Sequence, residues 1–132
     1  MTARLTTLAA PLGALLTGLA VAMGAFGAHG LKSRLTEQQL GWWHTAASYH
    51  LAHGLALLAL GLFLRVAPPS RPRAITAALW LLLLGFVLFS GSLYTMALTD
   101  LRALGAVTPF GGTSWLIAWG LLGWALWPRR PA

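Results

Sequence analysis

Histidine and tyrosine are the residue types in this chain whose spacing could do chemistry. Three of the four histidines and one of the two tyrosines lie in one apolar stretch, WWHTAASYHLAHGLALLAL, which covers residues 42–60. At 100° per residue, one narrow helical stripe carries Trp42, Ala46, Tyr49, His53 and Leu60. An ionisable side chain in such a stretch is by default a functional candidate, because lipid offers an imidazole no hydrogen-bond partner.

A second polar group follows another apolar run, where the sequence reads SGSLYT. Antiparallel pairing of two helices joined by a short loop would bring Ser90 to the depth of His53, with Tyr94 closer to the outer helix ends, near the level of Tyr49. We therefore expect His53 to face the bundle interior and to approach Ser90 and Tyr94. The predicted polar site consists of His53, Tyr49, Ser90, Ser92, Tyr94 and His29.

The sequence lacks the additional residues that a catalytic site or a metal site would need. A serine nucleophile needs a base that a third group orients, and the two acidic residues, Glu37 and Asp100, lie in predicted loops. His50 and His53 have the i, i+3 spacing of metal ligands, but no carboxylate or cysteine completes the site. We predict no catalytic residue and no metal site, and favour a protein that is not an enzyme. In the alternative, purely structural interpretation, His53 only fixes the register of the helices.

Haem is the cofactor that four histidines in a small bundle would invite. Its two axial histidines must come from similar depths on facing helices. His29 and His44 both lie near one predicted edge, whereas His53 has no histidine at its own depth on another helix of the chain. We therefore predict no cofactor, and a haem b held between two copies of the chain is the alternative.

The composition is that of a membrane protein. Of 132 residues, 58% are hydrophobic and 8% are charged, and there is no cysteine. A soluble domain carries about 25% charged residues, so this chain could not keep a wet surface. The net charge of +7 sits between apolar runs, which is typical of charges that orient helices in a bilayer and not of nucleic-acid binding.

Four apolar segments predict an all-α fold, an integral membrane four-helix bundle with antiparallel up-down-up-down topology. The whole chain, residues 1–132, forms a single membrane domain in this interpretation. The first segment begins like a signal peptide, but its apolar run is long enough to span. The predicted transmembrane helices cover about 5–28, 42–66, 73–99 and 109–127.

Local signals mark the ends of the second and fourth helices. Thr36 and Gln39 have the spacing of a capping box, so the second helix is expected to begin there as an interfacial turn. The prolines that follow Val66 end this helix. Thr108 is the predicted cap of the fourth helix, with Pro109 as its first residue.

The distribution of basic residues predicts the orientation in the membrane. The two termini and the second loop carry more of them than the first and third loops, so both termini are expected inside, in the cytoplasm. The polar and glycine-rich segments would then all lie in the outer leaflet. The residues counted are Arg4, Arg65, Arg71, Arg73, Arg129 and Arg130 on the inner side, and Lys32, Arg34 and Arg102 on the outer side.

Small residues predict where helices approach each other closely. Ala14 with Gly18, and Ala20 with Gly24, form the small-xxx-small pattern of packed membrane helices. We expect the contact at Gly27, in the outer half, to be tighter than any contact at Gly61 in the inner half. The predicted packing glycines are Gly24, Gly27, Gly91, Gly111 and Gly112.

Four motifs in this order, GAFGAHGLK, Tyr49-x-x-x-His53 followed by LALL, FSGSLY and TPFGG, resemble the family catalogued as domain of unknown function 423. The resemblance implies a small four-helix protein of bacterial inner membranes or of mitochondria, and it brings no established activity. His44 and His50 lie outside the family pattern, and Ala118-Trp119 stands where the family has Gly-Trp. The pattern keeps His29, Tyr49, His53, Ser90, Ser92, Tyr94, Pro109, Gly111 and Gly112.

Three classes of function stay open on this basis. The first is a non-enzymatic accessory protein, or a protein that binds a lipid or small molecule, with a polar, glycine-rich site in the outer leaflet. The second is an electron-transfer subunit that binds haem or quinone. The third is a structural subunit or assembly factor of a larger membrane complex. In each case the partners are the lipid bilayer of the bacterial inner membrane and a homo-oligomer or larger complex, with no nucleic acid.

Overall fold

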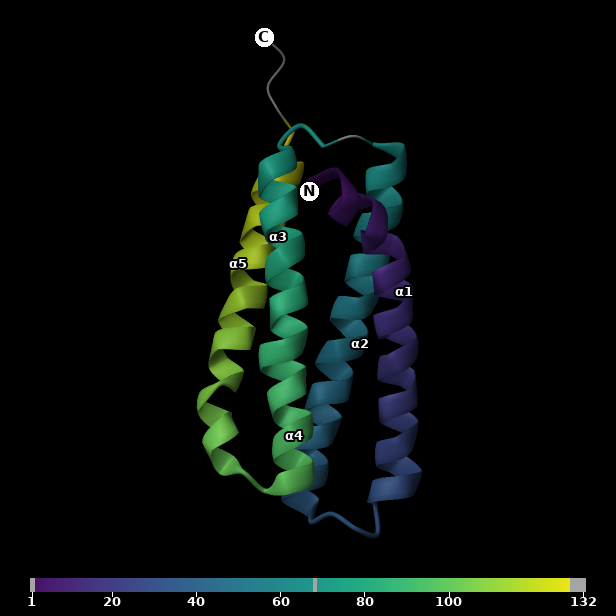
Figure 1. Cartoon of the computed structure of the whole chain (residues 1–132), viewed down its shortest axis with the longest axis vertical. Coiled ribbons are helices and arrows are strands. Elements are labelled where there is room, and N and C mark those ends of the chain that lie inside the picture. Colours follow the sequence, from purple (N-terminus) through teal and green to yellow (C-terminus); the bar gives the residue numbers. More distant parts are fainter. Residues whose placement is uncertain (1, 68, 129–132) are drawn as a thin grey trace.

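The computed structural model describes residues 2–67 and 69–128, and side chains from residue 5 onward, as an elongated bundle of helices. The helix α1 continues into the π-helical turn η1, and α3, the π-helical turn η2 and α4 form one continuous segment, so the chain makes four long helical segments (Figure 1). The bounds are α1 Thr2–Phe26, η1 Gly27–Leu31, α2 Glu37–Val66, α3 Pro72–Gly85, η2 Phe86–Gly91, α4 Ser92–Thr99, the 3-10 turn η3 Arg102–Ala106 and α5 Thr108–Leu126.

Consecutive segments run in opposite directions, as the four apolar runs predict. The first turn of α1 and the last turn of α5 lie at the same end, which also holds the connection from α2 to α3 (Figure 1). At this end the Arg71 guanidinium lies 4.7 Å from the centroid of the Trp124 ring and donates a hydrogen bond to the Trp124 carbonyl. This contact joins the start of α3 to the last turns of α5. The predicted roles of Arg129 and Arg130 fall outside the described residues.

Three segments of the described chain are long and apolar enough to cross a membrane: Leu5–Leu31, Glu37–Val66 and Pro72–Thr99. Their lengths are 27, 30 and 28 residues, so each exceeds the roughly 20 residues that a hydrocarbon core requires. The remaining helix, α5, has 19 residues, which corresponds to about 28 Å.

Capping chemistry explains the start of α2 and revises the start of α5. Thr36 Oγ1 accepts a hydrogen bond from the Gln39 backbone at 3.3 Å, and Gln39 Oε1 accepts one from the Thr36 backbone at 3.0 Å, so the predicted capping box is confirmed. The predicted cap at Thr108 is wrong, because Val107 is the N-cap and Thr108 is already the first residue of α5. The Thr108 hydroxyl pairs with Ser92 Oγ at 2.8 Å and ties α5 to α4.

The core has two parts that differ in side-chain type. The half near the chain termini is filled mainly by aliphatic residues, among them Ile75, Leu79 and Leu82, which are fully buried. The half near η1 and η3 is built around Trp43 and Tyr94, whose ring centroids lie 4.7 Å apart. The sequence pattern predicts this division into an aliphatic half and a half with polar and aromatic groups.

The closest approach of α1 and α2 lies in the aliphatic half. A Cβ at Gly61 would lie 2.6 Å from Ala10 Cα, and a Cβ at Gly13 would lie 2.5 Å from Leu58 Cα, so both glycines touch facing backbone. A Cβ at Gly27 would lie 2.5 Å from Cδ1 of the Trp43 side chain. The expectation that Gly27 marks a tighter contact than Gly61 is therefore wrong, because a backbone cannot rotate away as a side chain can.

The other predicted packing glycines divide into three groups. Gly111 packs against the backbone of η2, since a Cβ there would lie 2.8 Å from Phe89 Cα. Gly91 and Gly112 have room for a Cβ at ordinary contact distance, 3.5 and 3.6 Å from the nearest atoms. Gly24, like Gly18, faces open space, so neither glycine of the small-xxx-small pattern packs within the chain, whereas Ala20 of the same pattern is buried.

Candidate functional site

The π-helical turn η2 lies beside α5, at the level where the polar residues gather. π-turns are rare and occur frequently at functional sites. The carbonyls of Leu81 and Leu82, just before this turn, accept hydrogen bonds from Ser114 Oγ at 2.6 Å and from Trp115 Nε1 at 3.0 Å. The Trp115 indole is thereby fixed between α3 and α2, and it is only 3% exposed.

His53 lies against α5. Its ring stacks on Trp115 with centroids 3.7 Å apart and an interplanar angle of 10°. His53 Nδ1 is 2.8 Å from the Tyr49 carbonyl oxygen, and Trp119 Nε1 donates to His53 Nε2 over 3.2 Å. The expected approach to Ser90 and Tyr94 is not seen in its hydrogen bonds; on α3–η2–α4 the ring contacts Phe86, with centroids 6.5 Å apart.

These two hydrogen bonds determine the tautomer of His53. A carbonyl can only accept and an indole N–H can only donate, so Nδ1 carries the proton and Nε2 accepts. Both nitrogens of this imidazole are therefore engaged. A haem iron would need the Nε2 lone pair that Trp119 already uses, so Trp119 would have to move before His53 could serve as an axial ligand.

Tyr49 lies at the edge of the site. Its ring is parallel to that of Trp115 within 5° at a centroid distance of 6.0 Å, and parallel to that of His53 within 15°. The residue is 48% exposed, so the prediction that Tyr49 shares the buried stripe of His53 is wrong. In the described part of the chain no hydrogen bond engages its hydroxyl.

The buried face of α2 contains Ala46, His53 and Leu60 of the predicted stripe but neither Trp42 nor Tyr49. Its other members are Trp43, Ala47, His50, Gly54, Leu57 and Gly61. Trp43 Nε1 donates to the Met23 carbonyl at 2.7 Å, which fixes the rotation of α2 against α1. The helix α2 carries apolar residues on all of its faces, so hydrophobic periodicity alone did not identify the face that is buried.

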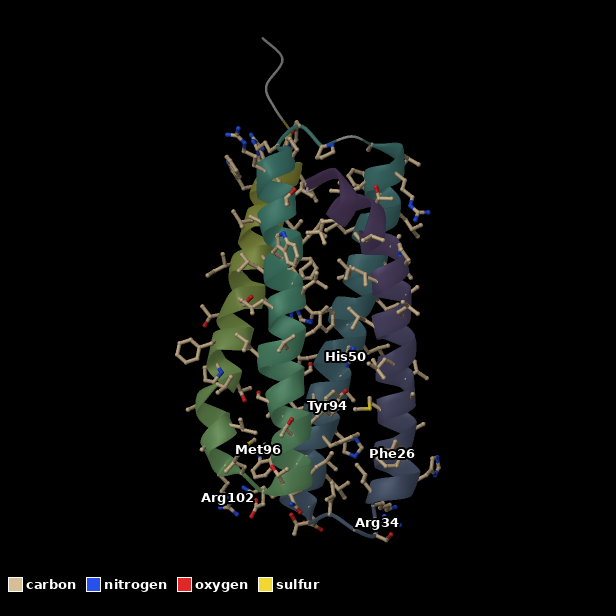
Figure 2. All side chains as sticks on the ribbon, in the orientation of Figure 1. Phe26, Arg34, His50, Tyr94, Met96 and Arg102 are labelled. Carbon is tan, nitrogen blue, oxygen red and sulfur yellow. The ribbon has the colours of Figure 1, made fainter. Side chains whose placement is uncertain are left out.

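A second polar cluster lies inside the bundle, where Figure 2 shows His50 and Tyr94 between α2 and α4. Tyr94 Oη is 3.4 Å from His50 Nδ1, and Ser90 Oγ donates to the Ala46 carbonyl at 3.2 Å. The histidine that contacts Tyr94 is thus His50, which lies outside the family pattern. Its Nε2 and the Thr17 hydroxyl are buried without hydrogen-bond partners among the described residues.

The remaining predicted site residues lie elsewhere. Ser92 Oγ bonds the Leu88 and Phe89 carbonyls at 2.6 and 3.0 Å, within η2 and beside Thr108. His29 is exposed on η1, as is His44 on α2, so the structure does not bring His29 to His53. No group of three metal-ligating residues occurs in the described ranges.

A cavity of about 340 Å³ opens beside His53, between α2 and α5. Sequence reasoning missed its two tryptophans, Trp115 and Trp119. Their i, i+4 spacing, like that of Tyr49 and His53, was the available signal. The cavity is lined by Tyr49, His53, Phe89, Gly112, Trp115, Leu116 and Trp119.

Comparison with known proteins places the chain in a family. The profile of the family described as "Protein of unknown function (DUF423)" matches residues 23–112. The chain is 45% identical over 111 residues to the UPF0382 membrane protein SH2409 of Staphylococcus haemolyticus, covering 84% of this chain and 88% of that protein. It is 44% identical over 108 residues to the UPF0382 membrane protein YwdK of Bacillus subtilis, covering 82% and 86%. No solved structure matches the chain significantly. This chain, a small multi-pass membrane protein, belongs to the DUF423 family, also called UPF0382.

Proposed function

We propose that this protein binds a membrane-dissolved small molecule or lipid in the cavity between α2 and α5, without catalysing a reaction on it. The single observation that supports this function is a set of three nearly parallel rings, Tyr49, His53 and Trp115, at an open cavity of about 340 Å³. Ligand cavities are commonly about 300–1,000 Å³, mostly apolar, with a few placed polar groups.

The proposal includes a membrane topology. All four segments cross the bacterial inner membrane, both termini are cytoplasmic, and the cavity opens sideways to lipid in the outer half. At 1.5 Å per residue, His53 lies about 24 Å from the start of α2 at Glu37. The site therefore reaches from the outer half to about the middle of α2. Leu116 and Trp119, on its rim, are 74% and 47% exposed, which supports access from the bilayer.

A matched pair of glycine substitutions on α5 tests binding. Gly112→Leu places a side chain in the cavity, and the nearest neighbour of its Cβ, at 3.6 Å, is in ordinary contact, so folding should survive. Gly120→Leu makes the same change on the same helix where nothing lies within 4 Å. Both variants and the wild type are extracted into native nanodiscs and examined by native mass spectrometry. Wild type and Gly120→Leu should retain a bound small molecule that Gly112→Leu loses. Identical spectra for all three would contradict the proposal.

A second function, subunit of a larger assembly, has one specific observation in its favour. Gly18 and Gly24 on α1, and Gly120 and Gly123 on α5, face open space although close packing is the usual role of glycine in membrane helices. Gly18→Leu should then shift the size of the detergent-solubilised particle, as measured by multi-angle light scattering. An unchanged mass across a tenfold range of protein concentration would remove this alternative for α1.

A further inference from the structure

A second cavity lies next to the one at His53, along the same pair of helices. The second has a volume of about 330 Å³, and Trp119 lines both cavities. Its walls are apolar throughout apart from the indole N–H of Trp119, which is engaged with His53. The lining residues are Ala56, Ala59, Leu60, Phe63, Trp119, Leu122 and Leu126. We refer to the two cavities together as the α2–α5 groove.

The α2–α5 groove is straight, because each wall is one helical stripe. On α2 the lining positions 49, 53, 56, 60 and 63 follow steps of three and four residues, and on α5 the positions 112, 115, 119, 122 and 126 do the same. From Tyr49 to Phe63 the rise along α2 corresponds to about 21 Å. A groove of this shape suits a long molecule that lies parallel to the helices.

The two ends of the groove differ in chemistry. One end is lined by three nearly parallel rings, Tyr49, His53 and Trp115, of which Tyr49 is the exposed one, and the Tyr49 hydroxyl is a donor without a partner among the described residues. The other end offers only aliphatic and aromatic surface. No lysine, arginine, aspartate or glutamate lines either cavity among the described residues. A phosphate headgroup would therefore find no charge to pair with.

We infer that the ligand of the α2–α5 groove is a prenylated quinone, held by binding alone. The inference rests on the function proposed above. A planar quinone ring would lie at the end that Tyr49, His53 and Trp115 line, within reach of the Tyr49 hydroxyl. Its carbonyl oxygens can only accept hydrogen bonds, which matches the one donor available, the Tyr49 hydroxyl. The apolar isoprenoid chain would lie along Ala59 and Phe63, where the groove offers only apolar surface.

The test uses the full chain in phosphatidylcholine nanodiscs and two probes, a benzoquinone with a ten-carbon tail and the same ring without a tail. Quenching of tryptophan fluorescence reports binding. The tailed quinone should quench saturably. Tyr49→Phe should weaken its affinity about five-fold, as expected for loss of one hydrogen bond. Tyr94→Phe, the same change at the buried tyrosine outside the groove, should leave the affinity within two-fold.

A substitution in the apolar half tests the position of the tail. Ala59→Phe should weaken binding of the tailed quinone and leave the tail-less ring unaffected. If quenching is linear in quinone and equal in wild type and Tyr49→Phe, the quinone only partitions into the bilayer and the inference is overturned. The proposed function would still stand if a phospholipid with brominated acyl chains quenched wild type more than Gly112→Leu. If wild type and Gly112→Leu also respond equally to brominated phospholipid, both proposals fail.

Discussion

The close packing of α1 on α2 should require glycine at position 61, because only a hydrogen atom fits there as a side chain. In Gly61→Ala the new Cβ would lie 2.6 Å from Ala10 Cα and 2.7 Å from the Ala9 carbonyl carbon, where carbon atoms normally stay about 3.5–4.0 Å apart. Relief requires α1 to move outward by about 1 Å. That movement would also open the contact of Gly13 with Leu58.

The expected magnitude follows from two opposing effects. Overpacking a well-filled interior costs about 1–3 kcal/mol, and contact with backbone favours the upper end of this range. Alanine gains about 1 kcal/mol over glycine in helix propensity. The net loss in the free energy of unfolding should therefore be about 2 kcal/mol. Gly18→Ala is the matched control on α1, since nothing lies within 4 Å of its Cβ and only the propensity gain applies.

Reversible unfolding in mixed micelles of a mild detergent and dodecyl sulfate, followed by circular dichroism, measures both variants. Gly61→Ala should unfold at a lower dodecyl sulfate fraction than wild type, and Gly18→Ala at an equal or higher one. Equal midpoints for the two variants would refute the close backbone approach described here. Gly61→Leu should also lose more folded protein than Gly27→Leu, because the obstacle at Gly27 is the Trp43 side chain and not backbone.

Three further outcomes are expected. Trp119→Phe removes the donor to His53 Nε2 and should lower the free energy of unfolding by about 1 kcal/mol, measured as above; no change would mean that this hydrogen bond does not form. Reporter fusions at Ser70 and after Ala132 should both report the cytoplasmic side, and one on the outer side would overturn the proposed topology. Purified protein should show no Soret band, since both nitrogens of His53 are engaged; a stoichiometric haem band lost in His53→Ala would refute this.

Part of the candidate site was predictable from residue types. Tyr49 and His53 are i, i+4 neighbours on a helix, so their proximity requires no tertiary information. The partners of His53 were not predictable, because Trp115 and Trp119 lie more than 60 residues away in the sequence. Tryptophan in a membrane helix also occurs facing lipid as readily as facing other helices. The pairing of Tyr94 with His50 also depends on how far α2 is rotated, and a helix that is apolar on all sides carries no sequence signal for that angle.

The sequence by itself determined that the chain lies in a membrane, that it is helical, and where α2 begins and ends. Long uncharged runs can satisfy their backbone in lipid only as helices, and the capping box at Thr36 and the prolines after Val66 act through local geometry. The tertiary structure alone decided which glycines touch backbone, which histidine is fully hydrogen-bonded and where the groove opens. Those properties depend on the rotation and spacing of whole helices, and these are set by many contacts between residues far apart in the chain, such as Trp43 with Met23 and Trp115 with Leu82.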